Sequence, residues 1–159
     1  MKSFKKIAAA AIAALALGLG FVSCATDSDD ELKLVATFYG TTNMNIPDDD
    51  GSSIPCIAQI TTKFYNNKEY LIHLNVAAIG TAATATMDWD DEIGTYSGDP
   101  TKNGETIKMT AKKSYDTENK KWVTVENPST DSYVISSTGT ITINETEDGE
   151  TVSITLTRQ

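Results

Sequence analysis

The sequence predicts an all-β domain: an antiparallel up-and-down meander of about eight strands that closes into a barrel, with a β-sandwich as the alternative. After residue 24 no stretch repeats its apolar residues at the helical spacing, and almost every apolar run is short and alternating. These runs recur about every dozen residues between turn-forming residues, a spacing typical of antiparallel sheets. The 23 threonines of this region suit the exposed face of a pleated sheet.

Residues 1–23 have the features of a secretory signal peptide. Three lysines form a basic start, an apolar run follows from residue 7 to 22, and Ser23 precedes Cys24. The segment resembles the lipobox of bacterial lipoproteins, in which an aliphatic and a small residue precede the cysteine, as Val22 and Ser23 do here. The resemblance implies that the Cys24 sulfur carries a diacylglyceryl group and that Cys24 becomes the acylated first residue of the mature chain.

Two alternatives remain open for this segment. Small residues at Ser23, Cys24 and Ala25 also suit an ordinary signal-peptidase cut after Ala25. A permanent transmembrane helix is disfavoured, because the 16 apolar residues from 7 to 22 fall short of the ~20 that span a bilayer. Ala25 after the cysteine resembles the outer-membrane sorting of many lipoproteins, which implies an outer-membrane location in the cell envelope.

Loss of residues 1–23 makes the remaining chain more acidic. The 136 residues that remain carry 10 basic and 22 acidic groups, a net charge of −12. Such a domain repels nucleic acid and anionic head groups, so we expect no nucleic-acid partner and a membrane attachment that comes from the acyl chains. Residues 24–31 are polar and acidic, and we interpret them as a tether ahead of a single domain over residues 32–159.

Strands within this domain are placed by the alternating runs and the turns between them. We expect strands near residues 32–39, 56–65, 69–77, 81–89, 93–98, 105–114, 121–126, 132–143 and 150–158. The longest predicted loop is Gly40 to Pro55. Tight turns between successive strands favour a meander, and closing the meander removes both exposed edges.

Two hairpins can be placed in register. Asp148-Gly149 is a strong signal for a two-residue turn, which sets Ile143 opposite Ile154 and Ile141 opposite Leu156 on one face. Thr142 then faces Thr155 on the other side, so both faces match.

The second hairpin needs a three-residue loop, Asn66-Asn67-Lys68, which pairs Phe64 with Tyr70, Ile60 with Leu74 and Ala58 with Val76. In that loop we expect Asn67 or Lys68 to adopt the left-handed conformation.

The sequence offers no convincing catalytic group, and we expect no enzyme activity and no cofactor. Two cysteines in a secreted chain invite a disulfide, but lipidation of Cys24 would consume that sulfur and leave Cys56 as a small buried apolar residue at the start of a strand. His73 lies between aliphatic residues in a strand pattern, without a serine-rich elbow or an acidic partner at a telling distance.

Acidic and aromatic residues give two weaker site hypotheses. Alternation places Asp88 and Asp90 on one face, where two carboxylates could hold Ca²⁺, but the spacing is not that of a calcium loop and an acidic turn explains them better. Several aromatic residues could line a pocket or stack on a sugar, although aromatics this sparse usually pack in cores and strand pairs. They are Tyr39, Tyr65, Tyr96, Trp89 and Trp122.

A second resemblance bears on the barrel. The run from Gly94 to Gly104, followed by residues 106–110, is similar to a hairpin of the lipocalin-like (calycin) barrels found in some bacterial surface lipoproteins. The resemblance implies a lipocalin-like barrel that binds a small, partly apolar molecule in its mouth, and it carries over no binding residue. We therefore expect a lipid-anchored binding module. The alternative is a structural or interaction lipoprotein whose loops contact another envelope protein or a host protein.

Overall fold

The computed structural model describes residues 31–47, 53–79, 86–87, 91–147 and 150–159. Within these ranges every regular element is a β-strand, as the sequence predicts. The strands are β1 (Leu34–Pro47), β2 (Ser53–Tyr65), β3 (Glu69–Ala78), β4 (Thr86–Met87), β5 (Asp91–Ser97), β6 (Thr106–Asp116), β7 (Lys121–Thr124), β8 (Thr130–Val134), β9 (Thr140–Glu147) and β10 (Glu150–Arg158). The predictions for Cys24, Asp88, Trp89, Asp90 and the Asp148-Gly149 turn itself lie outside the described residues.

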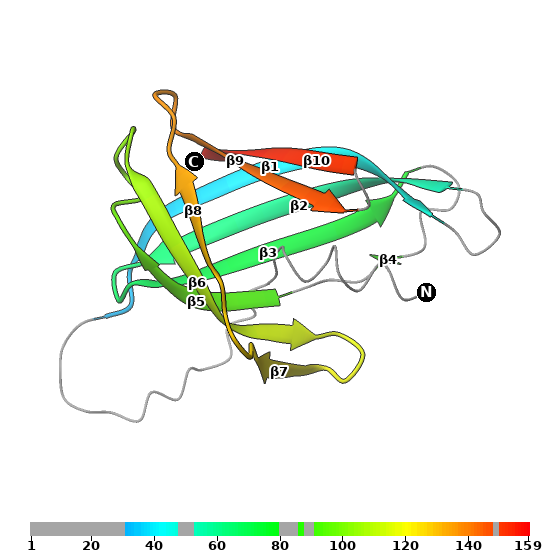
Figure 1. Cartoon of the computed structure of the whole chain (residues 1–159), viewed down its shortest axis with the longest axis horizontal. Helices are drawn as coiled ribbons and strands as arrows, with labels where there is room; N and C mark the ends of the chain where they lie inside the picture. The colour runs from blue at the N-terminus through cyan, green and yellow to red at the C-terminus, as the bar shows by residue number, and fades with distance from the viewer. Residues whose placement is uncertain (1–30, 48–52, 80–85, 88–90, 148–149) are drawn as a thin grey trace.

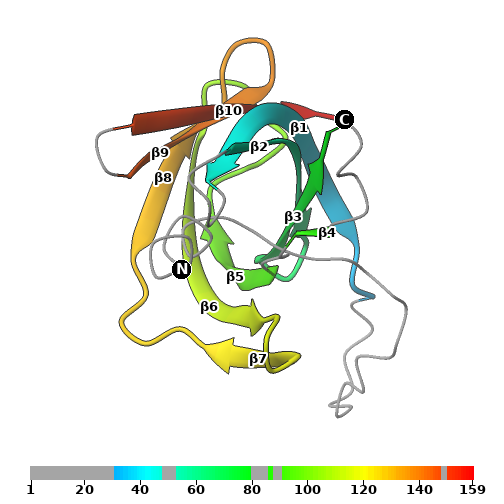
Figure 2. The same ribbon diagram turned by 90° about the vertical axis from the view of Figure 1, so that its right-hand side faces the viewer.

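All strand pairs are antiparallel and belong to one sheet, whose order is β7-β6-β5-β3-β2-β1-β10-β9. Strand β1 pairs with both β2 and β10, which brings the first and last strands side by side. Strand β6 pairs with β8 along its first half and with β7 along its second half. The sheet curls around a central axis into a half-barrel, which is consistent with a lipocalin-like barrel, and its strand order ends at β7 and β9 (Figures 1 and 2). The predicted fold class is therefore confirmed.

Both predicted hairpin registers are confirmed. Ile143 lies opposite Ile154 and Thr142 opposite Thr155, and the two isoleucines are buried while the two threonines are exposed. In the other hairpin Phe64 lies opposite Tyr70 and the remaining predicted pairs follow. Lys68 takes the left-handed conformation there, with φ of 64°.

The predicted loop from Gly40 to Pro55 is wrong over most of its length, because β1 runs on to Pro47 and β2 begins at Ser53. Residues 41–47 pair in unbroken register with β2, with Thr42 opposite Ala58 and Met44 opposite Cys56. Polar Thr and Asn alternate with the inward residues here, so a ladder partner, rather than local hydrophobicity, makes this segment a strand.

The predicted strand over residues 132–143 is two strands, β8 and β9, with a turn between them. Gly139 adopts a positive φ of 77° and its N–H donates to the Ser136 carbonyl at 3.0 Å. The Ser136 hydroxyl oxygen also accepts a hydrogen bond from the backbone N–H of Thr140 at 3.1 Å. Ser and Gly are turn-forming residues, so the short Ser-Ser-Thr-Gly sequence gave a turn signal that the predicted continuous strand overlooked.

The main core lies on the inward face of the curled sheet. Its centre is aromatic: Phe64 meets Phe38 edge-on at 5.8 Å between ring centroids and Tyr96 edge-on at 4.8 Å. Aliphatic side chains from β6, β9 and β10 and from the turn after β8 surround these rings. The full cluster comprises Ala36, Phe38, Ile60, Phe64, Tyr70, Ile72, Tyr96, Ile107, Met109, Ile135, Ile141, Ile143, Ile154 and Leu156. We call it the aromatic cluster.

One end of the barrel is joined by hydrogen bonds between loops. The Arg158 guanidinium donates to Asn103 Oδ1 at 2.7 Å and to the Pro100 carbonyl at 3.4 Å. Asn103 Nδ2 in turn donates to the Ser137 carbonyl at 2.7 Å, and Gly104 N–H donates to the Ile135 carbonyl at 2.7 Å. These bonds tie the end of β10 to the β5–β6 and β8–β9 loops.

Candidate functional site

A second apolar cluster continues the inner wall along β1, β2 and β3. Its buried members are Cys56, Ala58, Val76 and Ala78, and Met44, Ile54 and Leu74 pack against them while staying partly exposed. Cys56 lies opposite Ala78 and Ala58 opposite Val76 across the β2–β3 ladder. Because alternate residues of a strand share a face, these side chains extend the inward row that begins with Phe64 and Ile60. We call this group the small-residue cluster.

The two clusters differ in the size of their side chains. The aromatic cluster fills its space with Phe38, Phe64, Tyr70 and Tyr96, whereas the buried members of the small-residue cluster are two alanines, a valine and a cysteine. The four buried members of this cluster are at most 7% exposed. The inner wall therefore passes from large aromatic side chains to small apolar ones along the same strands.

Cys56 is a buried thiol within the small-residue cluster, as the sequence predicts, although it is the fourth residue of β2 rather than at its start. It has no exposed surface, and its Sγ lies 3.5 Å from the Ile54 carbonyl, to which it donates. Burial raises the pKa of the Cys56 thiol. A thiol held in its neutral form is a poor nucleophile, so Cys56 acts as a packing residue.

A carboxyl group, Glu92, lies on the inner wall next to the apolar residues. It is the second residue of β5 and shares a face with Gly94 and Tyr96. Tyr70, directly across from Gly94, donates its hydroxyl to Glu92 Oε1 at 2.5 Å. Gly94 is required here, because a Cβ would lie 2.6 Å from the Tyr70 ring and 2.2 Å from the Thr110 carbonyl oxygen.

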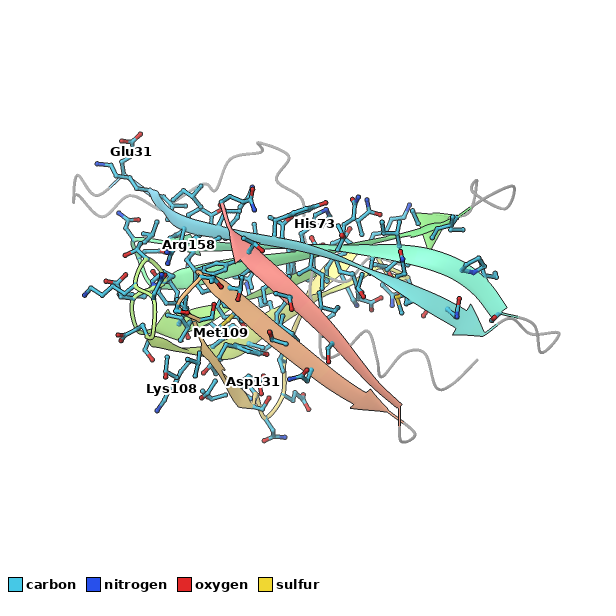
Figure 3. The ribbon with its side chains drawn as sticks, turned by 90° about the horizontal axis from the view of Figure 1, so that it is seen from above. Glu31, His73, Lys108, Met109, Asp131 and Arg158 are labelled. Carbon is cyan, nitrogen blue, oxygen red and sulfur yellow. The ribbon has the colours of Figure 1, made fainter. Side chains whose placement is uncertain are left out.

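The surroundings of Glu92 favour its neutral form. Burial is the largest effect and raises the pKa of the Glu92 carboxyl, the hydrogen bond from Tyr70 lowers that pKa, and the negative charge of Asp131 raises it. Asp131 lies opposite Met109 in the β6–β8 ladder (Figure 3). Burial and Glu92 together raise the pKa of the Tyr70 hydroxyl. Within the described residues no lysine or arginine forms an ion pair with Glu92. Its neighbours are the Tyr70 phenol and the Asp131 carboxylate.

The aromatic residues singled out in the sequence do not converge on one pocket. Tyr96 is buried in the aromatic cluster and donates its hydroxyl to the Tyr65 carbonyl at 2.8 Å. Tyr39 is 38% exposed on β1 and Trp122 is 39% exposed on β7. Tyr65 and Tyr96 are thus brought together, while Tyr39 and Trp122 lie on separate surfaces.

His73 is half-buried on the outward face of β3, where burial and the positive charge of Lys63 lower its pKa. No group of three or more His, Cys, Asp or Glu side chains that could hold a metal ion occurs in the described part of the chain. Nor do those residues include a helix that is long and apolar enough to cross a membrane.

Sequence reasoning missed the Glu92–Tyr70 pair. The signal was present in the alternation: if Tyr96 faces the core, Gly94 and Glu92 must face inward too. The acidic sequence around Glu92 instead suggested a solvated turn.

No protein-family model, curated protein or solved structure matches this chain. The resemblances to lipoproteins and to lipocalin-like barrels therefore remain expectations from residues 1–24 and 94–110, and the site is argued from its geometry.

Proposed function

We propose that this chain is a lipid-anchored lipoprotein of the outer membrane whose barrel binds a small, partly apolar molecule without catalysing a reaction. The anchor is the diacylglyceryl group on Cys24. The ligand lies against the small-residue cluster, in the part of the barrel beyond the aromatic cluster.

The observation that carries the proposal is the change of side-chain size along one continuous inner wall. Phe64 and Ile60 on β2 give way to Ala58 and Cys56 on the same face. An apolar guest placed there removes its own surface from water at ~25 cal/mol per Å². This favourable free energy of binding does not depend on a large number of polar contacts between the ligand and the protein.

Glu92, which lies opposite Ile72 of the aromatic cluster, would orient a ligand that extends toward it from the small-residue cluster. A neutral or partly ionised carboxyl beside an apolar wall accepts a hydrogen bond from a ligand hydroxyl or amine, and its ionised form attracts a cation. The proposed ligand is therefore an apolar molecule with a donor group at one end. This choice is favoured because Asp131 adds negative charge nearby, which disfavours an anionic end.

The anchor is tested by mass spectrometry of the protein purified from envelope membranes. We expect an acylated Cys24 as the first residue, and we expect Cys24→Ala to block processing. An unmodified first residue at Thr26 would show ordinary secretion instead and would revive the disulfide alternative for Cys56.

The binding site is tested by filling it. N-phenyl-1-naphthylamine, a neutral apolar amine whose fluorescence rises in apolar surroundings, serves as the probe. Ala58→Phe places a ring on the inner wall and should abolish the fluorescence rise. The matched control is Gln59→Phe, one residue along on the opposite face of β2, which should leave it intact.

Val76→Phe, across the ladder from Ala58, gives an independent second block if Ala58→Phe does not fold. Native mass spectrometry of the unaltered protein then asks whether a small molecule co-purifies with it. Equal probe binding by Ala58→Phe, Val76→Phe and Gln59→Phe would contradict the proposal and favour an interaction lipoprotein with a packed interior.

A further inference from the structure

The hairpin formed by β6 and β7 has a charge opposite to that of the rest of the chain. Residues 106–124 contain five lysines and two acidic residues, while all other residues together contain eight basic and twenty acidic ones. The five lysines are Lys108, Lys112, Lys113, Lys120 and Lys121, and all five are exposed. The strongly negative average of the sequence thus conceals a local positive surface.

The charge of Asp116, one of the two acids, is engaged in the turn of this hairpin. Its carboxylate accepts hydrogen bonds from the Asn119 backbone N–H at 3.0 Å and from Asn119 Nδ2 at 2.7 Å. These bonds hold the pKa of Asp116 below its usual value. Lys121 lies opposite Asp116 in the ladder, and its positive charge also lowers that pKa. Among the described residues none of the five lysines forms a close ion pair, so most of their positive charge is available to an external anion.

Apolar and aromatic side chains lie among these lysines. Trp122 and Val123 are each 39% exposed on β7. Trp122 lies opposite Tyr115 in the ladder, and the two rings meet edge-on at 5.5 Å. Every side chain of β7 is exposed. The Tyr115 contact positions the indole while leaving part of it open to solvent.

The hairpin also stands apart from the barrel. Strand β7 is at the end of the sheet order and its ladder is with β6. Figures 1 and 2 show it below the curled sheet, on the side of the molecule toward which the start of β1 also points. A flat surface on that side of the molecule could therefore contact β7.

We propose that the β6–β7 hairpin docks onto an anionic lipid surface, with Trp122 in the head-group region and the surrounding lysines on the anionic groups. Tryptophan and tyrosine have an apolar body and a polar edge that suit the lipid–water boundary. Lysine side chains lay their apolar stems along that boundary and keep the ammonium in water. An acidic protein partner would match the lysines but gives no reason for an indole held open beside them.

The inference rests on the proposed lipid anchor only for bringing the hairpin close to the membrane. An anchor at Cys24 does not by itself select which side of the domain faces the membrane. Repulsion of the other acidic surfaces and attraction of this hairpin would fix one side of the barrel against the lipid. Each lysine near an anionic surface is worth about fivefold in the docking equilibrium, from about 1 kcal/mol per charge.

The test uses the full chain with Trp89→Phe, which leaves Trp122 as the only tryptophan. The protein is reconstituted with vesicles of phosphatidylcholine, or of phosphatidylcholine mixed equally with phosphatidylglycerol, each with brominated acyl chains as the quencher. We expect a blue shift and quenching of Trp122 in the phosphatidylglycerol vesicles and much less in the neutral ones. Added salt should weaken both effects.

Two variants that lose the same number of positive charges distinguish an effect of the hairpin lysines from an effect of the net charge of the protein. Changing Lys112, Lys113, Lys120 and Lys121 to Gln should reduce the quenching to the neutral-vesicle level. The matched control changes four lysines outside the hairpin to Gln and should leave the quenching unchanged. Those lysines are Lys33, Lys63, Lys68 and Lys102.

Flotation of the vesicles distinguishes the two proposals. Protein that floats with both vesicle types but shows no quenching of Trp122 keeps its anchor and overturns the docking of the hairpin. Protein that does not float with neutral vesicles contradicts the anchor; quenching of its Trp122 by added anionic vesicles would still support the docking surface, and no quenching would overturn it.

Discussion

The aromatic cluster and the small-residue cluster lie on the same inner wall and are built from the same strands, yet they pack differently. Phe64 has no exposed surface and meets two other rings edge-on. Val76, six pairings along the same two strands, is buried among alanines and a cysteine. The comparison indicates that the aromatic cluster supplies most of the stability, while the small-residue cluster is the place where we propose that a ligand binds.

The largest expected effect separates these two clusters directly. Phe64→Ala removes a fully buried ring with two aromatic partners and should destabilise the domain by ~3–5 kcal/mol. Val76→Ala removes two methyl groups and should cost roughly 1.5 kcal/mol. Denaturant unfolding of both variants measures the free energies. Equal losses would mean that both clusters are equally well packed and would end the distinction between them.

A comparable effect is expected on the β9–β10 hairpin. Ile154→Ala removes an inward side chain from the aromatic cluster and should cost ~2–5 kcal/mol. Thr155→Ala changes the adjacent exposed position, whose hydroxyl lies 3.4 Å from that of Thr142, and should cost under about 1 kcal/mol. The same unfolding measurements apply. Similar costs at both positions would contradict the inward assignment of Ile154.

The part of the fold that could be predicted from the sequence follows from strand alternation and turn chemistry. The pairs around Asp148-Gly149 and Asn66-Lys68 follow from loop length and matching faces, and both registers are confirmed. Those signals are local. The extension of β1 over residues 41–47 is not local, because its polar residues become a strand only through pairing with β2.

The candidate site depends on contacts that no short-range pattern contains. Tyr70 and Glu92 are 22 positions apart and meet because Gly94 lets the tyrosine ring lie across β5. The lysines of β6 and β7 were visible in the sequence, but the net charge of the whole chain concealed them. Pairing of the two strands places Lys113 and Lys121 within two ladder positions of Trp122, while Lys108 lies on the part of β6 that pairs with β8.

A smaller effect is expected from Glu92, which lies opposite Ile72 on the inner wall, on the pH dependence of the free energy of unfolding. Because burial raises the folded-state pKa of Glu92, this carboxyl contributes stability below its unfolded pKa, and that contribution is lost as pH rises through the folded pKa. Glu92→Gln should remove this loss, so the variant should gain stability relative to the unaltered protein as pH rises from about 4 to 7. Denaturant unfolding across that range measures the difference.

Tyr70→Phe and Asp131→Asn should shift the pKa of Glu92 in opposite directions. Loss of the Tyr70 hydroxyl should raise the pKa of Glu92 further, because its hydrogen bond favours the ionised carboxylate. Loss of the Asp131 charge should lower that pKa. Carboxyl-carbon NMR titration of Glu92 reads both shifts. A titration at the ordinary glutamate value in all three proteins would show that Glu92 is solvated.

The division of the inner wall is tested most directly by methyl NMR during titration with N-phenyl-1-naphthylamine. We expect the methyl signals of Ala58, Val76 and Ala78 to shift together and saturably, while those of Ile107, Ile135 and Leu156 in the aromatic cluster stay in place. Shifts confined to the aromatic cluster, or no saturable shift at Ala58, Val76 and Ala78, would contradict a ligand site on the small-residue wall.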